Sequence, residues 1–301
     1  MEREKEENRG GKLKVRKMCG LTHLFWQNLE RDKGPILSTG FDKIDEETGG
    51  FLPQEYWIIG ADARIGKTSL ALNLALSVAK QGGNVLYCIT EMSDLRLVQK
   101  IIGIVANINT KKLWDKDRLL KEEIDSLFYT TKEMEKLPLY TVAGQSFSAY
   151  AISQLILLAK AREIIFEVVF VDYIQQLLEA QGQDWFAGLQ MASFTLQSIA
   201  KEENVCLVAL SQLSKLGQKA IVRGDLDVWA LKGSSAMSQN ADVVLLLERK
   251  YADMDIREQL KIKIDKARYG ESGEHFIANF DLPSGKIREE KDVNRPTKRK
   301  G

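Results

Sequence analysis

A Gly-Lys-Thr triplet between an apolar run and a helical pattern constrains the fold more than any other feature of the chain. The apolar run covers residues 56–59, and the helical pattern covers residues 68–80. The segment ADARIGKT, residues 61–68, has the spacing of a phosphate-binding loop, with Ala61 in place of the usual first glycine. Such a loop directs backbone N–H groups and a helix N-terminus at polyphosphate. We therefore expect a strand, a phosphate-binding loop and a helix in succession; a helix cap that contains GKT by chance is the alternative.

Nine consecutive residues of this loop are expected to contact a nucleotide: Ala61, Asp62, Ala63, Arg64, Ile65, Gly66, Lys67, Thr68 and Ser69. The Lys67 ammonium would bridge the outer phosphates, and the Thr68 hydroxyl would bind Mg²⁺. The predicted ligands of the loop are therefore ATP and Mg²⁺.

From residue 38 onward the chain alternates between strand-like and helical segments. Strands are predicted at residues 56–59, 85–89, 139–142, 168–171, 205–210, 243–247, 260–264 and 276–280. Helices are predicted at residues 68–80, 94–106, 116–136, 148–162 and 185–203. The strands VVFV and VCLVAL are apolar without alternation, which is typical of a parallel sheet that helices cover on both faces. The predicted fold class is therefore α/β with a mostly parallel sheet, and short turns between the last strands predict an antiparallel C-terminal edge.

Both ends of the chain differ in composition from residues 36–290. Residues 1–17 mix both charges with little apolar content and are predicted to be disordered, as is the basic, proline-containing segment 291–301. Apolar residues at helical spacing predict a short amphipathic helix within residues 18–35: Leu21, Leu24, Phe25 and Leu29. This helix would pack either on the core of its own domain or on a neighbouring subunit.

Composition restricts the location and the partners of the protein. No apolar stretch is long enough to span a membrane, and the charged start lacks the apolar segment of a secretory signal, so we expect a cytoplasmic protein without membrane contact. The net charge is +1, from 43 basic and 42 acidic residues. Nucleic-acid binding would therefore depend on local basic patches.

Polar residues follow three of the predicted strands, at the edge where parallel sheets bind ligands. Asp172 ends the run VVFV and is predicted to hold Mg²⁺ together with Thr68; an acid that caps the next turn is the alternative. Glu91 follows the run VLYCIT and would deprotonate the attacking water, unless it only starts the next helix. Gln212 ends the run VCLVALSQ and would sense the γ-phosphate, unless its amide only satisfies local backbone groups.

Several motifs together resemble the C-terminal motor domain of DnaB-type replicative helicases, in the family's order and at about its spacing over residues 37–290. The matching runs are STGFDKID at 38–45, TGG at 48–50, IGKT at 65–68, TEMS at 90–93, VDYIQ at 171–175, LSQLS at 210–214, SQNAD at 238–242 and KAR at 266–268. The run LKGSSA at 231–236 is also similar to phage primase-helicases and the mitochondrial helicase Twinkle. The resemblance implies a RecA-like P-loop core and an ATP-dependent, ring-forming DNA helicase motor in DNA replication.

The resemblance also implies roles for individual residues. Five residues match active-site positions of the family: Lys67, Thr68, Glu91, Asp172 and Gln212. Lys266 and Arg268 match a lysine and an arginine that reach the γ-phosphate bound by a neighbouring subunit. Because the two residues are two positions apart on a predicted strand, their side chains point to the same side. A basic strand end that only contacts solvent is the alternative.

The implied assembly is a homo-oligomer, a hexamer, around single-stranded DNA with 5′-to-3′ movement. Residues 21–33 are similar to the family's linker helix, which docks on the adjacent subunit. Ahead of this helix the family has a helical domain, which is expected to be absent here. A primase or a loader is a further implied partner, with coupling that would differ from the family's.

Two loops are expected near DNA because the family places them toward the central channel. Residues 178–188 are rich in Gly and Gln, and their Trp185 either stacks on a base or packs within the protein. Residues 214–235 carry the predicted DNA-binding group: Lys215, Lys219 and Arg223. Contacts from these side chains to phosphates would give little sequence preference and strong salt dependence.

Two other functions would use the same phosphate-binding loop and Asp172. One is a RecA-like filament or scaffold that holds DNA without unwinding it, and the other is a regulatory ATPase ring that acts on proteins. The LSQLS run, residues 234–242 and the pair Lys266 and Arg268 favour the helicase motor.

Overall fold

The computed structural model describes residues 36–144, 147–214, 217, 226–227, 231, 234–249, 258–268, 270 and 272–290, together with Met18, Thr22 and Trp26. The chain divides into two units, Met1–Ile36 and Leu37–Gly301. In the first unit, Met18, Thr22 and Trp26 are helical, in the region where a linker-like helix is predicted. The predicted disordered segments 1–17 and 291–301 lie outside the described residues, so both remain predictions.

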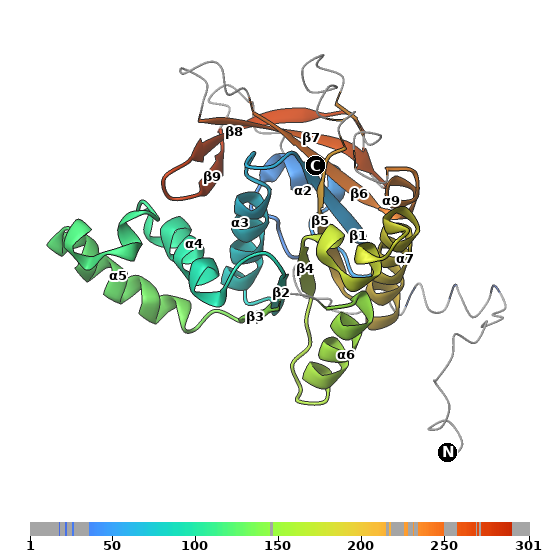
Figure 1. Cartoon of the computed structure of the whole chain (residues 1–301), viewed down its shortest axis with the longest axis horizontal. Helices are drawn as coiled ribbons and strands as arrows, with labels where there is room; N and C mark the ends of the chain where they lie inside the picture. The colour runs from blue at the N-terminus through green and yellow to red at the C-terminus, as the bar shows by residue number, and fades with distance from the viewer. Residues whose placement is uncertain are drawn as a thin grey trace. The chain divides into compact units, whose positions relative to one another are not determined.

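Within the described residues, nine strands of the second unit form one sheet in the order β3-β2-β4-β5-β1-β6-β7-β8-β9 (Figure 1). The strands are β1 (Tyr56–Ala61), β2 (Val85–Ile89), β3 (Leu139–Ala143), β4 (Val168–Asp172), β5 (Cys206–Gln212), β6 (Val243–Glu248), β7 (Gln259–Ala267), β8 (His275–Asp281) and β9 (Lys286–Glu289). Pairs from β3 to β6 are parallel, and pairs from β6 to β9 are antiparallel. The predicted parallel sheet with an antiparallel C-terminal edge is confirmed.

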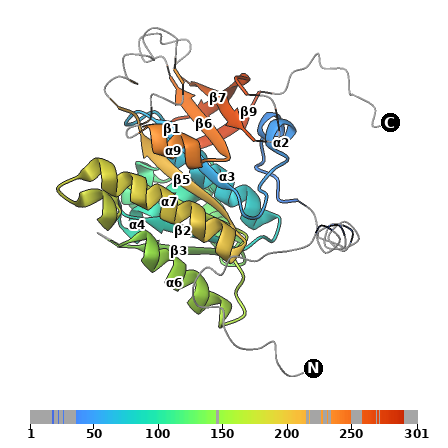
Figure 2. The ribbon, with the colours of Figure 1, turned by 90° about the vertical axis from the view of Figure 1, so that its right-hand side faces the viewer.

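Helices cover both faces of this sheet (Figures 1 and 2). Helices α2, α3 and α4 pack on one face, through buried residues such as Leu74 and Leu97. Helices α6, α7 and α9 pack on the other, through buried residues such as Ile152 and Leu196. The α-helices are α2 (Asp42–Thr48), α3 (Lys67–Lys80), α4 (Asp94–Ala106), α5 (Lys121–Met134), α6 (Ala149–Lys160), α7 (Trp185–Glu203) and α9 (Ser234–Asn240). The short 3₁₀ turns are η1 (Lys112–Trp114), η2 (Lys116–Arg118), η3 (Ile174–Gln176) and η4 (Leu178–Gln181).

Burial along the strands follows this layering. Every residue of β2 and β4 is buried, because helices cover both sides of these central strands. In β7 buried residues alternate with partly exposed ones, and Leu260, Ile262 and Ile264 face the core. Burial is therefore continuous in these central parallel strands and alternates in the antiparallel strand β7.

The helix predicted over residues 116–136 is wrong in its first part, where the structure has the 3₁₀ turn η2 followed by α5. The backbone of Leu119 and Leu120 is extended, which separates the two elements. The Glu123 side chain accepts a hydrogen bond from the Leu120 N–H at 2.8 Å and so starts α5 afresh. The short elements α2, α9 and β9 were not predicted, because each is too brief to show a clear period.

The strand register brings the predicted site residues to one edge of the sheet. Ile89 pairs with Asp172 between β2 and β4, and Ala61 pairs with Gln212 between β1 and β5. The carboxyl ends of these four parallel strands therefore meet, and the loops that follow them share one edge.

Candidate functional site

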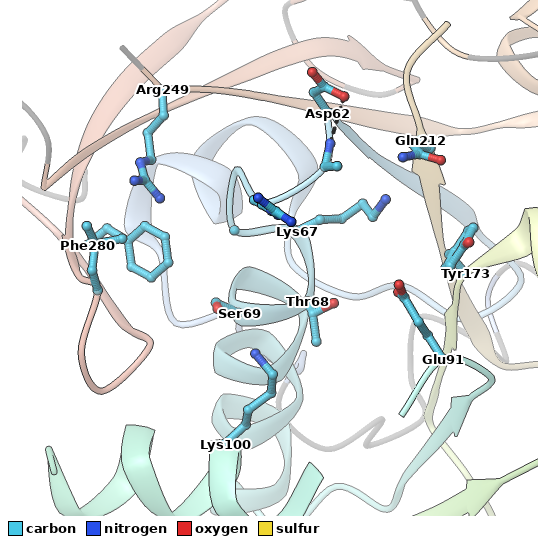
Figure 3. Close-up of a pocket in the computed structure, with 14 residues that line it drawn as sticks. Asp62, Lys67, Thr68, Ser69, Glu91, Lys100, Tyr173, Gln212, Arg249 and Phe280 are labelled. Atoms are coloured by element: carbon cyan, nitrogen blue, oxygen red, sulfur yellow. Dashed lines mark hydrogen bonds between the residues drawn. The ribbon is translucent and has the colours of Figure 1, made fainter. Parts of the chain in front are cut away.

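A cavity of about 420 Å³ lies at this edge, beside the N-terminus of α3 (Figure 3). Its wall comes from the loop after β1, the start of α3, the segments after β2 and β4, the end of β5, helix α4 and the antiparallel edge. The lining residues are Asp62, Ala63, Arg64, Gly66, Lys67, Thr68, Ser69, Glu91, Lys100, Tyr173, Gln212, Arg249, Phe280 and Leu282. The unpaired N–H groups of a helix N-terminus and several cations thus face one space, which suits a polyanion.

Gly66 shapes the loop that enters α3. Its φ of 127° lies in the region that residues with a side chain rarely adopt. A Cβ atom at this position would also lie 2.7 Å from Cε1 of Phe280. Glycine is therefore required here both by the backbone conformation and by the close approach of β8.

Lys67 is the first residue of α3, and its ammonium lies 5.2 Å from the centroid of the Tyr173 ring. Among the described residues it makes no hydrogen bond or ion pair. Burial lowers the pKa of Lys67, and the charges of three carboxylates counteract this effect: Asp172, Glu91 and Asp62. A bound polyphosphate would add the negative charge that keeps this buried ammonium protonated.

Thr68 lines the cavity, and Asp172 is joined to it by a hydrogen bond. The Thr68 hydroxyl donates a hydrogen bond to Oδ2 of Asp172 at 2.8 Å, and the Tyr87 hydroxyl lies 3.1 Å from the same oxygen. The Asp172 side chain is only 1 % exposed, and burial raises its pKa, while the Thr68 hydrogen bond and the Lys67 charge counteract this rise. The Asp172 carboxylate is hydrogen-bonded to Thr68 of α3 and not to the turn that follows β4, and Asp172 itself is not among the residues that line the cavity.

The Thr68 and Asp172 pair fits a magnesium ion that a phosphate helps to hold. Mg²⁺ prefers oxygen ligands and is usually bound by one or two protein oxygens together with water and substrate phosphates. No group of three or more His, Cys, Asp or Glu residues in the described part of the chain could hold a metal alone. The two oxygens at the N-terminus of α3 therefore suit a shared ion and not an independent metal site.

Glu91 and Gln212 stand on the side of the cavity near Tyr173 (Figure 3). Glu91 lies two residues after β2, and Gln212 is the last residue of β5. Gln175 joins β5 to the segment after β4, because its amide nitrogen donates to the Ser211 hydroxyl at 2.9 Å and its amide oxygen accepts from the Gln212 N–H at 3.3 Å. A polar residue that follows β4 thus holds the end of β5 in place.

Two of the nine predicted loop contacts lie away from the cavity. Ala61 is the last residue of β1 and is fully buried, and its carbonyl accepts a hydrogen bond from the Leu213 N–H. Ile65 turns into the core, since its side chain is apolar and 4 % exposed. The side chains of Ala61 and Ile65 therefore do not reach the cavity, and the expected contact of these two residues with a nucleotide stays a prediction. The other seven, residues 62–64 and 66–69, line the cavity.

Lys266 and Arg268 do not line the cavity; they gather around the end of α9. The Lys266 ammonium donates to the carbonyls of Ser238 at 2.8 Å and Ala241 at 2.6 Å. Arg268 forms a 2.7 Å ion pair with Asp242, whose side chain is 3 % exposed, while the Arg268 side chain stays 45 % exposed. Burial lowers the pKa of Lys266, and the neighbouring Arg268 charge adds to this effect. Both cations are thus held by their own chain, away from its own cavity.

Five lining residues were not predicted from the sequence: Lys100, Tyr173, Arg249, Phe280 and Leu282. The Arg249 guanidinium lies 5.2 Å from the centroid of the Phe280 ring and donates to the Ile65 carbonyl at 3.3 Å. Phe280 was interpreted as part of a core strand, and no linear motif marks Arg249. The charge of Lys100 within an apolar helical stripe was the one signal that could have been followed.

The predicted DNA-binding residues Lys215, Lys219 and Arg223 lie outside the described residues. Trp185, the alternative stacking residue, is the first residue of α7 and is partly exposed, with its ring 6.0 Å from that of Phe186. Its environment is therefore a pair of surface aromatic rings and not the sheet core.

Comparison with known proteins places this geometry in a family. A sequence profile of the family described as "DnaB-like helicase C terminal domain" matches residues 36–282. The chain is 29 % identical over 252 residues to a probable plasmid replicative DNA helicase of Chlamydia muridarum, covering 83 % of this chain and 54 % of that protein. It is 29 % identical over 218 residues to the replicative DNA helicase DnaB of Treponema pallidum, covering 71 % and 48 %. The chain thus spans about half the length of the curated relatives it matches.

Two solved structures share the fold. The ATPase domain of G40P has a TM-score of 0.83 at 22 % identity, covering 92 % of this chain and 100 % of that one. A DnaB-like replicative helicase, solved in a study of its interactions with primase, has a TM-score of 0.81 at 23 % identity, covering 90 % and 68 %. The expected RecA-like ATPase fold is confirmed.

Proposed function

Because this chain belongs to the DnaB-like helicase C-terminal domain family, we propose that it is the ATP-hydrolysing motor of a ring-forming DNA helicase. The motor would translocate 5′ to 3′ on single-stranded DNA during DNA replication. The observation that carries the proposal is the hydrogen-bonded pair Thr68 and Asp172 at the N-terminus of α3, beneath a cavity that Lys67 and Glu91 line. These groups together are what nucleoside triphosphate hydrolysis requires.

The cavity suggests how ATP would lie. The terminal phosphates belong beside Lys67, Thr68 and Gln212, because these residues combine a cation, a helix N-terminus and an amide. The nucleoside belongs at the other end, where Figure 3 shows Arg249 and Phe280 side by side. A guanidinium and an aromatic ring offer flat surfaces on which a base can stack.

The residues of this chain then have distinct tasks in hydrolysis. Thr68 and Asp172 would hold Mg²⁺, which supplies positive charge to the phosphate oxygens when it is bound. Glu91 orients the attacking water and takes its proton, and Lys67 stabilises the charge on the terminal phosphates. Gln212 reports the state of the γ-phosphate to the segment that follows β5, since it ends that strand.

The neighbouring subunit would complete the site. Lys266 and Arg268 lie away from their own cavity, and the half-exposed Arg268 is available to a second copy of the chain. Sharing of this kind requires a homo-oligomer, which we propose to be a hexamer with one site at each interface. A primase or loader is proposed as a further partner; one of the structurally similar helicases was studied for its interactions with primase.

No helix in the described part of the chain is long and apolar enough to cross a membrane. We propose a cytoplasmic location, in keeping with a role in DNA replication.

The proposed DNA contacts can be tested with the triple variant Lys215→Ala, Lys219→Ala and Arg223→Ala. We expect its Kd for single-stranded DNA to rise by about tenfold or more, with a weaker dependence of binding on salt, because three phosphate contacts are lost. Fluorescence anisotropy at several salt concentrations measures the Kd and its dependence on salt. The matched control removes three exposed lysines in and just after α5 instead, Lys121, Lys132 and Lys136, and should bind as the wild type does. Equal binding by both triple variants would refute the loop assignment.

Unwinding of a forked duplex tests the function itself. We expect ATP-dependent strand separation when the 5′ tail is present and little when only the 3′ tail is present, together with stimulation of ATP hydrolysis by single-stranded DNA. Native mass measured on addition of ATP should show a ring-sized oligomer. Stimulation by DNA without unwinding would favour the RecA-like filament or scaffold, and the absence of any response to DNA would favour the regulatory ATPase.

A further inference from the structure

Lys100 occupies an unusual place on helix α4. The helix packs its apolar stripe on the core through Leu97, Ile101 and Ile104. Lys100 comes three residues after Leu97 and four before Ile104, so it belongs to the same side of the helix. A charged side chain on a core-facing stripe is costly to desolvate unless it has a partner. In the structure Lys100 leaves the core and lines the nucleotide cavity (Figure 3).

The Lys100 ammonium makes no hydrogen bond or ion pair with any residue that the structure describes. Two other cations near α4 and the cavity do have such partners. Lys112 pairs with Glu123 at 2.7 Å, and Arg249 donates to the Ile65 carbonyl. A cation that reaches a cavity without a protein partner is suited to a ligand that brings negative charge.

The two lysines of the cavity approach it from different sides. Figure 3 shows the Lys100 side chain rising from α4 toward Ser69, whereas the Lys67 side chain extends toward Tyr173 and Gln212. Ser69 lies between the proposed terminal-phosphate end and the nucleoside end at Phe280. The phosphate expected beside Ser69 is therefore the α-phosphate, which is bonded to the sugar.

We propose that Lys100 is a second phosphate-binding lysine, which contacts the α-phosphate of the bound nucleotide. The inference rests on the proposed function, since it takes the cavity to bind a nucleoside triphosphate. ATP and ADP both carry this phosphate, so Lys100 contributes equally to the affinity for both. It also ties α4, the helix that begins just after Glu91, to nucleotide occupancy.

The test is the variant Lys100→Met, which keeps an unbranched side chain and removes the charge. Calorimetry with ADP and with adenylyl imidodiphosphate, each with Mg²⁺, gives the two Kd values. We expect both to rise by a similar factor of about tenfold or more, the loss typical of a hydrogen bond to a charged group. Lys100→Arg should restore most of the affinity. Lys121→Met, an exposed lysine at the start of α5, is the control and should match the wild type.

Several results would overturn the inference. Unchanged affinity for both nucleotides would show that Lys100 does not contact the ligand. A loss confined to adenylyl imidodiphosphate would place Lys100 at the terminal phosphate instead. If Lys100→Met lowered both the Tm and the affinity for nucleotide, and Lys100→Arg did not restore the affinity, Lys100 would have a structural role. We expect the Tm to stay unchanged, because Lys100 makes no hydrogen bond or ion pair with a described residue. If the wild-type protein bound neither nucleotide, the proposed function itself would be refuted. The Lys100 variants test only the role of this lysine.

Discussion

Replacement of Glu91 by Gln is expected to lower the rate of ATP hydrolysis by about 10²- to 10⁴-fold, the usual contribution of a general base. The affinity for ATP should stay within about threefold of the wild type, because the amide has the same shape and Glu91 is not expected to bind the phosphates. Steady-state turnover and a direct binding measurement on the same preparation give the two numbers.

The position of Glu91 explains why a large and selective effect is expected. Glu91 lines the cavity on the side of Tyr173, and its charge is close enough to act on the pKa of Lys67. A carboxylate at this place can take a proton from a water molecule beside the terminal phosphate. Glu122→Gln, which changes an exposed glutamate of α5, is the control and should hydrolyse ATP at the wild-type rate. Normal turnover by Glu91→Gln would remove Glu91 from the mechanism.

Replacement of Arg268 by Ala is expected to lower the rate of ATP hydrolysis by about 10³- to 10⁵-fold, as for arginines that act from a neighbouring subunit in related chemistry. The Lys67→Ala variant should be inactive for a different reason, since it lacks the lysine of the phosphate-binding loop. When the two inactive proteins are mixed, about a quarter of the interfaces in a random ring combine an intact Lys67 with an intact Arg268. We therefore expect hydrolysis to reappear on mixing.

The ion pair between Arg268 and Asp242 requires a control in this experiment. Loss of Arg268 leaves the buried Asp242 carboxylate without this partner, which lowers the free energy of unfolding. The double variant Arg268→Ala with Asp242→Asn should regain stability without regaining activity, so Tm and turnover separate the two effects. If the mixed variants stay inactive although each assembles with the wild type, the sites are not shared between subunits.

Much of the fold and of the site could be predicted because the signals are local. The Gly-Lys-Thr triplet lies between β1 and α3, and the residue after a buried strand must lie at the edge of the sheet. For this reason Lys67, Thr68, Glu91 and Gln212 could be placed together before the structure was known, and all four line the cavity. Local signals were weak where the helix breaks at Leu119, because the apolar spacing continues across the break.

The sequence alone determined the parallel α/β sheet, its antiparallel edge and the phosphate-binding loop, since uninterrupted apolar strands and contiguous motifs depend only on neighbours along the chain. Tertiary structure alone decided which distant residues complete the cavity. Arg249 contacts Ile65 across 184 positions, and Lys100 enters from a helix whose other residues pack on the core. Such contacts depend on how the helices pack on the sheet, and the spacing of residues along the chain does not specify which distant side chains this packing brings together.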